Sequence, residues 1–184
     1  NEGAAREAAT VIGEPLLHGL IAAGCAVTLV TRDPLRAAYL FQGRVRCIRN
    51  CTELATSTRI DAVINLAGAS VAGGRWNAKR RKLLMQSRIS VTQDLVDWID
   101  RAVIRPCVFI QASAVGFYGC QPADRLLDEN QLPGNEFMSS LCQQWEKCAS
   151  ALDALGVRRT TLRFGLVFGA SGGALPLLLM SYRF

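Results

Sequence analysis

Short apolar stretches rich in β-branched residues alternate along the chain with longer stretches of helical periodicity, and this alternation limits the fold more than any other feature. The expected strands are Cys25–Thr31, Val45–Ile48, Asp61–Leu66, Cys107–Ala112 and Val157–Phe164. The expected helices are Pro15–Ala23, Leu35–Phe41, Asn77–Arg101, Glu136–Leu155 and a last one that starts near Leu175. Strands that alternate with long helices are typical of βαβ crossovers and a parallel sheet covered on both faces. We therefore predict an α/β fold with a doubly wound parallel sheet.

The length predicts a single domain over residues 1–184, because 184 residues can build one substantial core but not two. Half of the residues are apolar, which excludes a disordered chain. The uncharged run of residues 15–31 contains His18, Gly19 and Gly24 and ends in a strand pattern, so we expect no membrane association. The first residues lack the apolar segment of a signal peptide, which favours a cytosolic or organelle-matrix setting, and we expect a cytoplasmic protein.

The seven cysteines are odd in number and include no C-x-x-C pair, which is typical of reduced, packed thiols in a reducing compartment. Cys47 and Cys51 are close in sequence, but the chain holds one histidine, so we expect no metal site. The net charge of +6 suits an anionic partner such as a phosphorylated small molecule or a nucleic acid. The basic run Lys79–Lys82 lies in the first turns of an amphipathic helix without interleaved aromatic residues, so we expect a solvated face and no nucleic acid partner.

The residues after each expected strand are the first candidates for a binding site, because ligands of doubly wound sheets bind beyond the carboxyl ends of the strands. Arg32 follows one strand at a position where NAD-binding proteins usually carry an acid, whereas a basic side chain there can pair with the additional phosphate of NADP. A solvated arginine in an ordinary turn is the alternative. Ala67 and Gly68 follow the strand DAVINL, and their small size lets the backbone approach a flat ligand, although a tight strand exit would look the same.

Six segments, in order, resemble the extended short-chain dehydrogenase/reductases, and within them the nucleotide-sugar epimerase-like branch of the NAD(P)-dependent epimerase/dehydratase family. They are VTRDP, DAVINLAG, GGRWNAKRRKLLMQSRISVTQDLVDWI, FIQASAVGFYG, the stretch from DEN to WEKCA, and LRFGLVFGASGGAL. Together they cover most of Cys25–Leu175. The resemblance implies a Rossmann-like domain from which two parts are missing. These are the first strand and the smaller substrate-binding region that follows the last helix in the family.

The resemblance also implies which residues contact a cofactor, expected to be NADP with NAD as the alternative. These residues are Leu66, Ala67 and Gly68 along the cofactor, and Phe164, Gly165 and Val167 near the nicotinamide. Ser113, after the strand 107–112, would hydrogen-bond a substrate hydroxyl or carbonyl, whereas a serine that only caps the strand end is the alternative.

Arg88 falls on the apolar stripe of the helix 77–101, and a buried guanidinium needs a partner. A phosphate of the substrate or of the cofactor is one candidate partner. An internal carboxylate, that of Glu146 or Asp128, is the other.

Two parts of the family pattern are altered in this chain. The family transfers protons with a tyrosine and a lysine four residues later, whose ammonium lowers the pKa of the phenol, and this chain contains no Tyr-x-x-x-Lys. Tyr118 is a candidate acid if its loop folds over the site, and is otherwise a surface aromatic. A glycine loop aligned on Gly13 places Glu7 and Thr10 where the first two glycines belong, next to the expected pyrophosphate.

These features lead to two main hypotheses. The first is an NADP-linked epimerase or reductase that acts on a nucleotide sugar or a related hydroxyl or carbonyl compound by hydride transfer, with Ser113 polarising the reacting oxygen. The second is a module that senses a dinucleotide or binds another protein without catalysis. An inactive fragment is a third hypothesis, and homo-oligomers remain open.

Overall fold

The computed structural model describes residues 3–71, 75–169 and 172–180. The helices are α1 (Gly3–Ala22), α2 (Pro34–Leu40), α3 (Ala78–Arg101), α4 (Phe137–Cys148), α5 (Ala151–Ala154) and α6 (Leu175–Met180), with the short 3-10 helices η1 (Cys51–Glu53) and η2 (Val115–Tyr118). The strands are β1 (Thr28–Val30), β2 (Arg46–Ile48), β3 (Ala62–Asn65), β4 (Val108–Ala114), β5 (Arg158–Phe164), β6 (Phe168–Gly169) and β7 (Gly172–Gly173). The expected alternation of strands and helices is confirmed.

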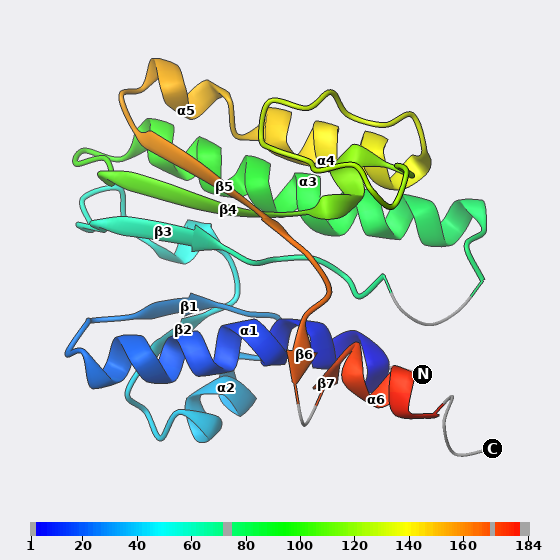
Figure 1. Cartoon of the computed structure of the whole chain (residues 1–184). Helices are drawn as coiled ribbons and strands as arrows, with labels where there is room; N and C mark the ends of the chain where they lie inside the picture. Colours follow the sequence, from blue (N-terminus) through cyan, green and yellow to red (C-terminus); the bar gives the residue numbers. More distant parts are fainter. Residues whose placement is uncertain (1–2, 72–74, 170–171, 181–184) are drawn as a thin grey trace.

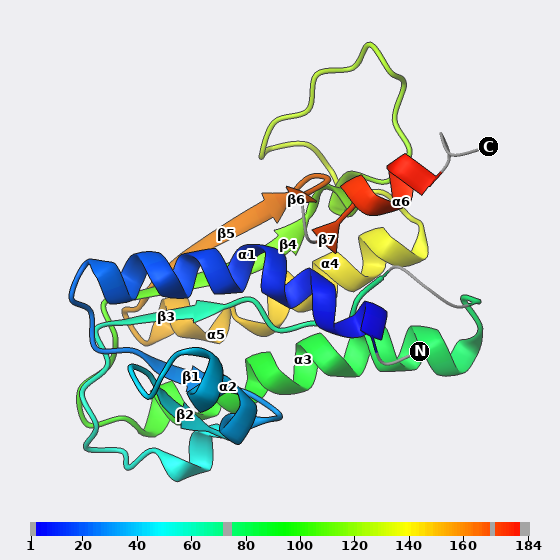
Figure 2. The same ribbon diagram turned by 90° about the horizontal axis from the view of Figure 1, so that it is seen from below.

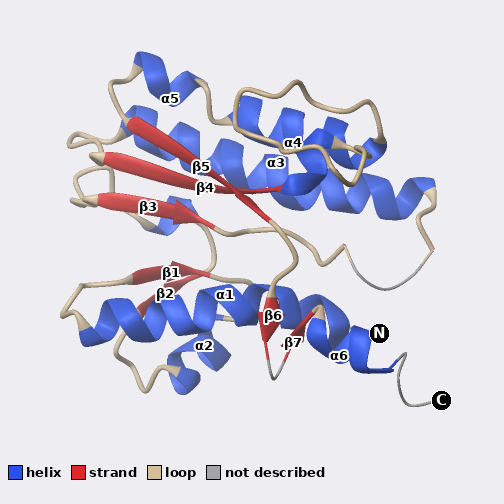
Figure 3. Ribbon diagram, viewed as in Figure 1, coloured by secondary structure: helices blue, strands red, loops and turns tan. Residues whose placement is uncertain are grey.

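The strands form two parallel sheets and one hairpin (Figures 1 and 3). Strand β1 pairs with β2, the order of the other sheet is β3-β4-β5, and β6 pairs with β7 in antiparallel fashion. No strand in the described part of the chain connects β1 with β3. In the doubly wound order one further strand lies between the positions that β1 and β3 correspond to. The fold is therefore a Rossmann-like α/β fold whose sheet is in two parts.

Helices flank the strands on both sides (Figure 2). Helices α3, α4 and α5 lie on one side of β3–β5, and α1 lies on the other side of β3 from α3. The main core lies between the sheet and the first group of helices, where Phe109, Ile99 and Leu152 are fully buried. Burial of apolar side chains between the layers stabilises this arrangement. The carboxyl ends of the strands lie outside this core, and the residues that follow the strands form the candidate site.

Helix α1 begins earlier than the sequence predicts. The predicted helix starts at Pro15, with a glycine loop before it, whereas the structure is helical from Gly3 to Ala22 and contains Pro15 inside the helix. The prediction of a loop at residues 6–13 is wrong, because the segment AAREAA has high helix propensity and no glycine lies between Gly3 and Gly13. The side chains of Glu7 and Thr10 lie outside the described part of the structure.

Other predicted boundaries agree closely with the structure. Helix α3 begins directly after Asn77, whose side chain accepts a hydrogen bond from the backbone nitrogen of Arg80. Gly24 has a φ of 76°, as a residue that ends a helix often does. The prediction of one continuous helix over residues 136–155 is wrong, because the chain tightens into i→i+3 hydrogen bonds around Ser150 and forms two helices, α4 and α5.

Candidate functional site

The carboxyl ends of β3, β4 and β5 bring several of the predicted residues to one edge of the sheet. In the parallel register Asn65 lies opposite Gln111, and Ser113 lies opposite Arg163. Leu66, Ala67 and Gly68 therefore leave β3 at the same edge at which β4 ends after Ser113 and β5 ends at Phe164. Parallel strands place such residues side by side. Arg32 lies at the carboxyl end of β1, in the other sheet.

Ser113 is part of a buried ionic network. Its Oγ donates a hydrogen bond of 2.6 Å to Oε1 of Glu146 on α4. The same carboxylate accepts two hydrogen bonds from Arg163, of 3.0 Å from Nε and 2.9 Å from Nη2. The side chains of Arg163 and Glu146 are 18% and 14% exposed, so both charges are largely removed from water and depend on each other. The hydrogen bonds to Glu146 raise the pKa of the Arg163 guanidinium above its ordinary value.

Tyr118 belongs to the same network and is not a surface aromatic. It is 7% exposed, and its Oη accepts a hydrogen bond of 2.9 Å from Nη1 of Arg163. The neighbouring ring of Phe117 lies 3.5 Å from Cζ of Arg163, measured to the ring centroid, which is a cation–π contact. The short helix η2, which the sequence predicts as loop, turns Tyr118 inward. One guanidinium therefore organises Ser113, through Glu146, and Tyr118 directly.

Sequence reasoning did not identify Glu146 and Arg163 as parts of the site. The sequence suggests Glu146 only as an ion-pair partner of Arg88, and it indicates no role for Arg163 beyond its place in the expected strand 157–164. A sequence signal was present, because Arg163 lies at the end of an expected strand and Glu146 lies on an amphipathic helix. Only the packing of α4 against β4 and β5 shows that the two residues meet.

Arg88 has carbonyl groups, not a carboxylate, as its partners. Its guanidinium donates to the backbone oxygens of Leu84 and Ala69, both at 3.1 Å, and lies 5.0 Å from the ring centroid of Trp145. The suggested pairing with Glu146 or Asp128 is wrong, because Glu146 is bound to Arg163 and no ion pair of the described residues includes Arg88. Burial lowers the pKa of this guanidinium.

The turn after β3 is held by hydrogen bonds of Asn65 and by the neighbouring side chain of Arg88. Asn65 donates to Oγ1 of Thr92 at 2.9 Å, and its Oδ1 accepts from the backbone nitrogen of Ala67 at 3.1 Å. A Cβ atom on Gly68 would lie 2.9 Å from Cζ of Arg88, so any larger residue here has to displace the Arg88 guanidinium. Gly13 of α1 lies beside the same turn, since a Cβ there would be 4.0 Å from Cδ1 of Leu66.

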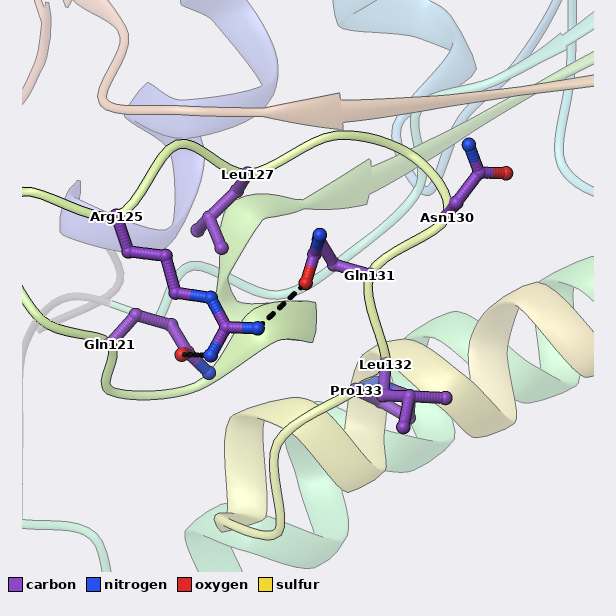
Figure 4. Close-up of a pocket in the computed structure, with 7 residues that line it drawn as sticks. All are labelled: Gln121, Arg125, Leu127, Asn130, Gln131, Leu132 and Pro133. Carbon is purple, nitrogen blue, oxygen red and sulfur yellow. Dashed lines mark hydrogen bonds between the residues drawn. The ribbon is translucent and has the colours of Figure 1, made fainter.

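The loop of residues 119–136 lies next to the network and contains a hollow of about 310 Å³ (Figure 4). The hollow is lined by Gln121, Arg125, Leu127, Asn130, Gln131, Leu132 and Pro133. Figure 4 shows the Arg125 guanidinium between the side chains of Gln121 and Gln131, to which it donates hydrogen bonds of 3.0 and 2.8 Å. Two further bonds tie the loop to the site, from Gln121 to the backbone oxygen of Tyr118 and from Arg163 to that of Glu129.

Of the remaining predicted residues, Arg32 and Gly165 are exposed, whereas Phe164 and Val167 are partly buried. Arg32 is exposed and forms no ion pair with the described residues. Gly165 is exposed, with nothing within 4 Å of an added Cβ, and the backbone oxygen of Val167 accepts from Ala174 at 2.8 Å. The end of β5 therefore offers space at Gly165, and the end of β1, in the other sheet, carries the exposed positive charge of Arg32.

All seven cysteines are free thiols. No cluster of three or more His, Cys, Asp or Glu side chains in residues 3–71, 75–169 and 172–180 is suited to a metal ion. No helix in these ranges is long and apolar enough to span a membrane.

Comparison with known proteins gives relatives that are longer than this chain. The chain is 37% identical over 125 residues to the epimerase family protein YfhF of Bacillus subtilis, a match that covers 68% of this chain and 41% of YfhF. The structure of the human epimerase family protein SDR39U1 with NADPH has a TM-score of 0.77 and 32% identity, over 94% of this chain and 56% of that one. The structure of MoeE5 with UDP-glucose and NAD has a TM-score of 0.69 and 25% identity, over 91% and 55%.

The family-level match covers nearly the whole chain. Residues 8–180 match the model of the NAD dependent epimerase/dehydratase family. The matched range contains the turn after β3, the network around Arg163 and the residues after β5. The chain therefore belongs to the NAD-dependent epimerase/dehydratase family.

Proposed function

We propose that the chain is the dinucleotide-binding part of an NADP-linked epimerase or reductase that acts on a nucleotide sugar or a related hydroxyl or carbonyl compound by hydride transfer. The observation that carries the proposal is the edge at which Ser113 and Tyr118, both held by the Arg163–Glu146 pair, lie beside the turn 66–68. Human SDR39U1, crystallised with NADPH, and MoeE5, crystallised with UDP-glucose and NAD, support it.

The residues at the strand ends fit a dinucleotide in two places. The charge of Arg32 suits the phosphate on the adenosine ribose, and the open space at Gly165 suits the nicotinamide end, near Phe164 and Val167. The turn of Leu66, Ala67 and Gly68 would lie along the cofactor between them. Because residues 6–13 are helical, the amides of a glycine loop do not take part, and an added Cβ at Gly13 would lie at an ordinary contact distance from Leu66. Arg88 acts on the cofactor through the turn, since its donors hold the carbonyl of Ala69.

The hydrogen-bond directions in the network assign different tasks to Ser113 and Tyr118. The bound nicotinamide would supply or accept the hydride. A guanidinium can only donate, so Tyr118, which accepts from Arg163, keeps its own hydroxyl hydrogen for a substrate oxygen. The hydroxyl hydrogen of Ser113 is donated to Glu146, so Ser113 Oγ is free to accept a hydrogen bond from a substrate hydroxyl. Donation to a substrate carbonyl would require the Ser113 hydroxyl to rotate away from Glu146. Tyr118 is then the proton donor, and Ser113 orients the hydroxyl form of the substrate.

A non-catalytic module that senses a dinucleotide is the second candidate function. It is favoured by the helix in place of a glycine loop and by the lack of a Tyr-x-x-x-Lys pair. The two candidates differ in turnover and share cofactor binding.

Titration with NADPH and NADH, followed by tryptophan fluorescence and thermal shift, tests the proposal. We expect binding of NADPH with higher affinity than NADH, and an Arg32→Ala variant that loses this preference. No response to either nucleotide at millimolar concentration would refute the assignment of a dinucleotide site. Turnover of a panel of nucleotide sugars and small carbonyl compounds separates the two functions, since Ser113→Ala and Tyr118→Phe lower it only if the chain is catalytic.

A further inference from the structure

Two acidic residues near the carboxyl ends of β1 and β2 accept hydrogen bonds from backbone amides. Oδ1 of Asp33 accepts from the backbone nitrogen of Arg36 at 3.1 Å and caps α2. Oε1 of Glu53 accepts from the backbone nitrogens of Arg49 and Asn50, at 2.8 and 3.2 Å, in the capping box of η1. Both carboxylates are therefore engaged by amide groups and form no ion pair with an arginine of the described residues.

Two arginines lie at the ends of these neighbouring strands, and the side chain of one contacts the backbone of the other. Arg32 follows β1 and Arg49 follows β2, and the two strands pair in parallel with Val30 opposite Ile48. Nη1 of Arg49 donates a hydrogen bond of 3.1 Å to the backbone oxygen of Arg32, which holds the Arg49 side chain across the end of β1. Both residues are exposed, and no ion pair of the described residues includes either of them.

A phosphomonoester has the chemistry that this pair of residues would recognise. It carries close to two negative charges and three acceptor oxygens, and arginines bind such groups through several N–H donors at once. A guanidinium has five N–H donors, and the bond to the Arg32 carbonyl uses one of those of Arg49. That bond also restricts the Arg49 side chain before any ligand arrives, which reduces the conformational entropy lost on binding.

We propose that Arg49 and Arg32 together bind the 2′-phosphate of NADP, and that Arg49 is a determinant of the choice of NADP over NAD. The inference rests on the proposed function and extends it from one arginine to a pair on neighbouring strands. Arg32 lies at a position that the family uses to distinguish NADP from NAD. The evidence for Arg49 is its hydrogen bond to the backbone oxygen of Arg32.

Adenosine 2′,5′-bisphosphate and 5′-AMP separate this contact from the rest of the cofactor site, because they differ only in the 2′-phosphate. The affinities are measured by isothermal titration calorimetry for the wild type, Arg32→Ala, Arg49→Ala and Arg49→Lys. Arg44→Ala is the matched control, since Arg44 is also exposed and its loss changes the net charge equally. We expect the wild type to prefer the bisphosphate, and Arg49→Ala to weaken its binding about tenfold or more, the effect of one charge-assisted hydrogen bond, with 5′-AMP unchanged. Arg49→Lys should retain part of the affinity, and Arg44→Ala all of it.

The outcomes distinguish failure of the inference from failure of the proposed function. If Arg32→Ala weakens bisphosphate binding and Arg49→Ala does not, the pair is refuted and the NADP preference stands. If Arg49→Ala and Arg44→Ala weaken both nucleotides equally, only net charge acts and the inference is again refuted. If the wild type does not distinguish the two nucleotides, the NADP assignment fails as well.

Discussion

Replacement of Arg163 by methionine removes a cation that holds both Glu146 and Tyr118. The variant loses two hydrogen bonds to the carboxylate, one to the phenol oxygen, one to the backbone oxygen of Glu129 and the contact with the Phe117 ring. It leaves the Glu146 carboxylate, 14% exposed, with Ser113 as its remaining side-chain partner. Methionine has a similar length and fills most of the space, so the cost comes mainly from the uncompensated charge.

The expected loss is about 3 kcal/mol in the free energy of unfolding. Breaking a buried ion pair by removal of one partner costs about 3–5 kcal/mol, and the remaining exposure of this pair places it at the low end. Chemical denaturation with urea measures the loss directly, and thermal unfolding should show a decrease of about 6–12 °C for a chain of this size.

Arg159→Met is the matched control, because Arg159 lies on the same strand and pairs with Asp153. That pair is 23% and 55% exposed, so its loss should cost about 1 kcal/mol or less. Equal losses for the two variants would refute the reasoning that the Arg163–Glu146 pair is set apart by its burial.

Three further predictions concern the turn, the loop and the sheets. Gly68→Ala should lower the free energy of unfolding in urea by about 1–2 kcal/mol, because the new Cβ would lie 2.9 Å from Cζ of Arg88. Gly19→Ala is the control and should be neutral or stabilising, since nothing lies within 4 Å of its Cβ. A neutral Gly68→Ala would contradict the close approach. Hydrogen bonds from the backbone nitrogen of Cys120 and from Ser139 lower the pKa of Glu136 below its ordinary value of 4.5, so their contribution is present above pH 4.5 and is lost as the pH falls through the lowered pKa. Limited proteolysis should then cut the loop 119–136 faster at low pH in the wild type, and Glu136→Gln should remove this pH dependence; an equal pH dependence in both would show that another group controls the loop. Hydrogen exchange should be slowest in β4, which pairs on both sides, and faster in β1 and β3, each of which has one described neighbour; protection of β3 equal to that of β4 would contradict the division into two sheets.

The parts of the fold that local patterns encode were predictable from the sequence. Helix α3 begins within one residue of its predicted start, because Asn77 provides a cap and the apolar stripe of Leu84 and Ile99 continues to its end. The start of α1 was predicted wrongly, because a family pattern was aligned on Gly13 in a segment whose own composition favours helix.

The site was predictable only in part, because its key contacts join distant elements. The strand ends placed Ser113 and the turn 66–68 at one edge, as the parallel arrangement requires. The Arg163–Glu146 pair depends on how α4 packs against the sheet, and no local pattern encodes it. Arg88 shows a further reason, since reasoning from charge looked for a carboxylate partner, whereas two carbonyl oxygens and the Trp145 ring receive this guanidinium.

Hydrogen exchange measured with and without saturating NADPH tests most directly whether the carboxyl-end edge is a dinucleotide site. We predict slower exchange at residues 66–70, 113–118 and 164–167, and no change at residues 103–107 and 156–158, which lie at the amino ends of β4 and β5. Protection at the amino ends alone, or unchanged exchange at the carboxyl ends in the saturated protein, would contradict the assignment of the site.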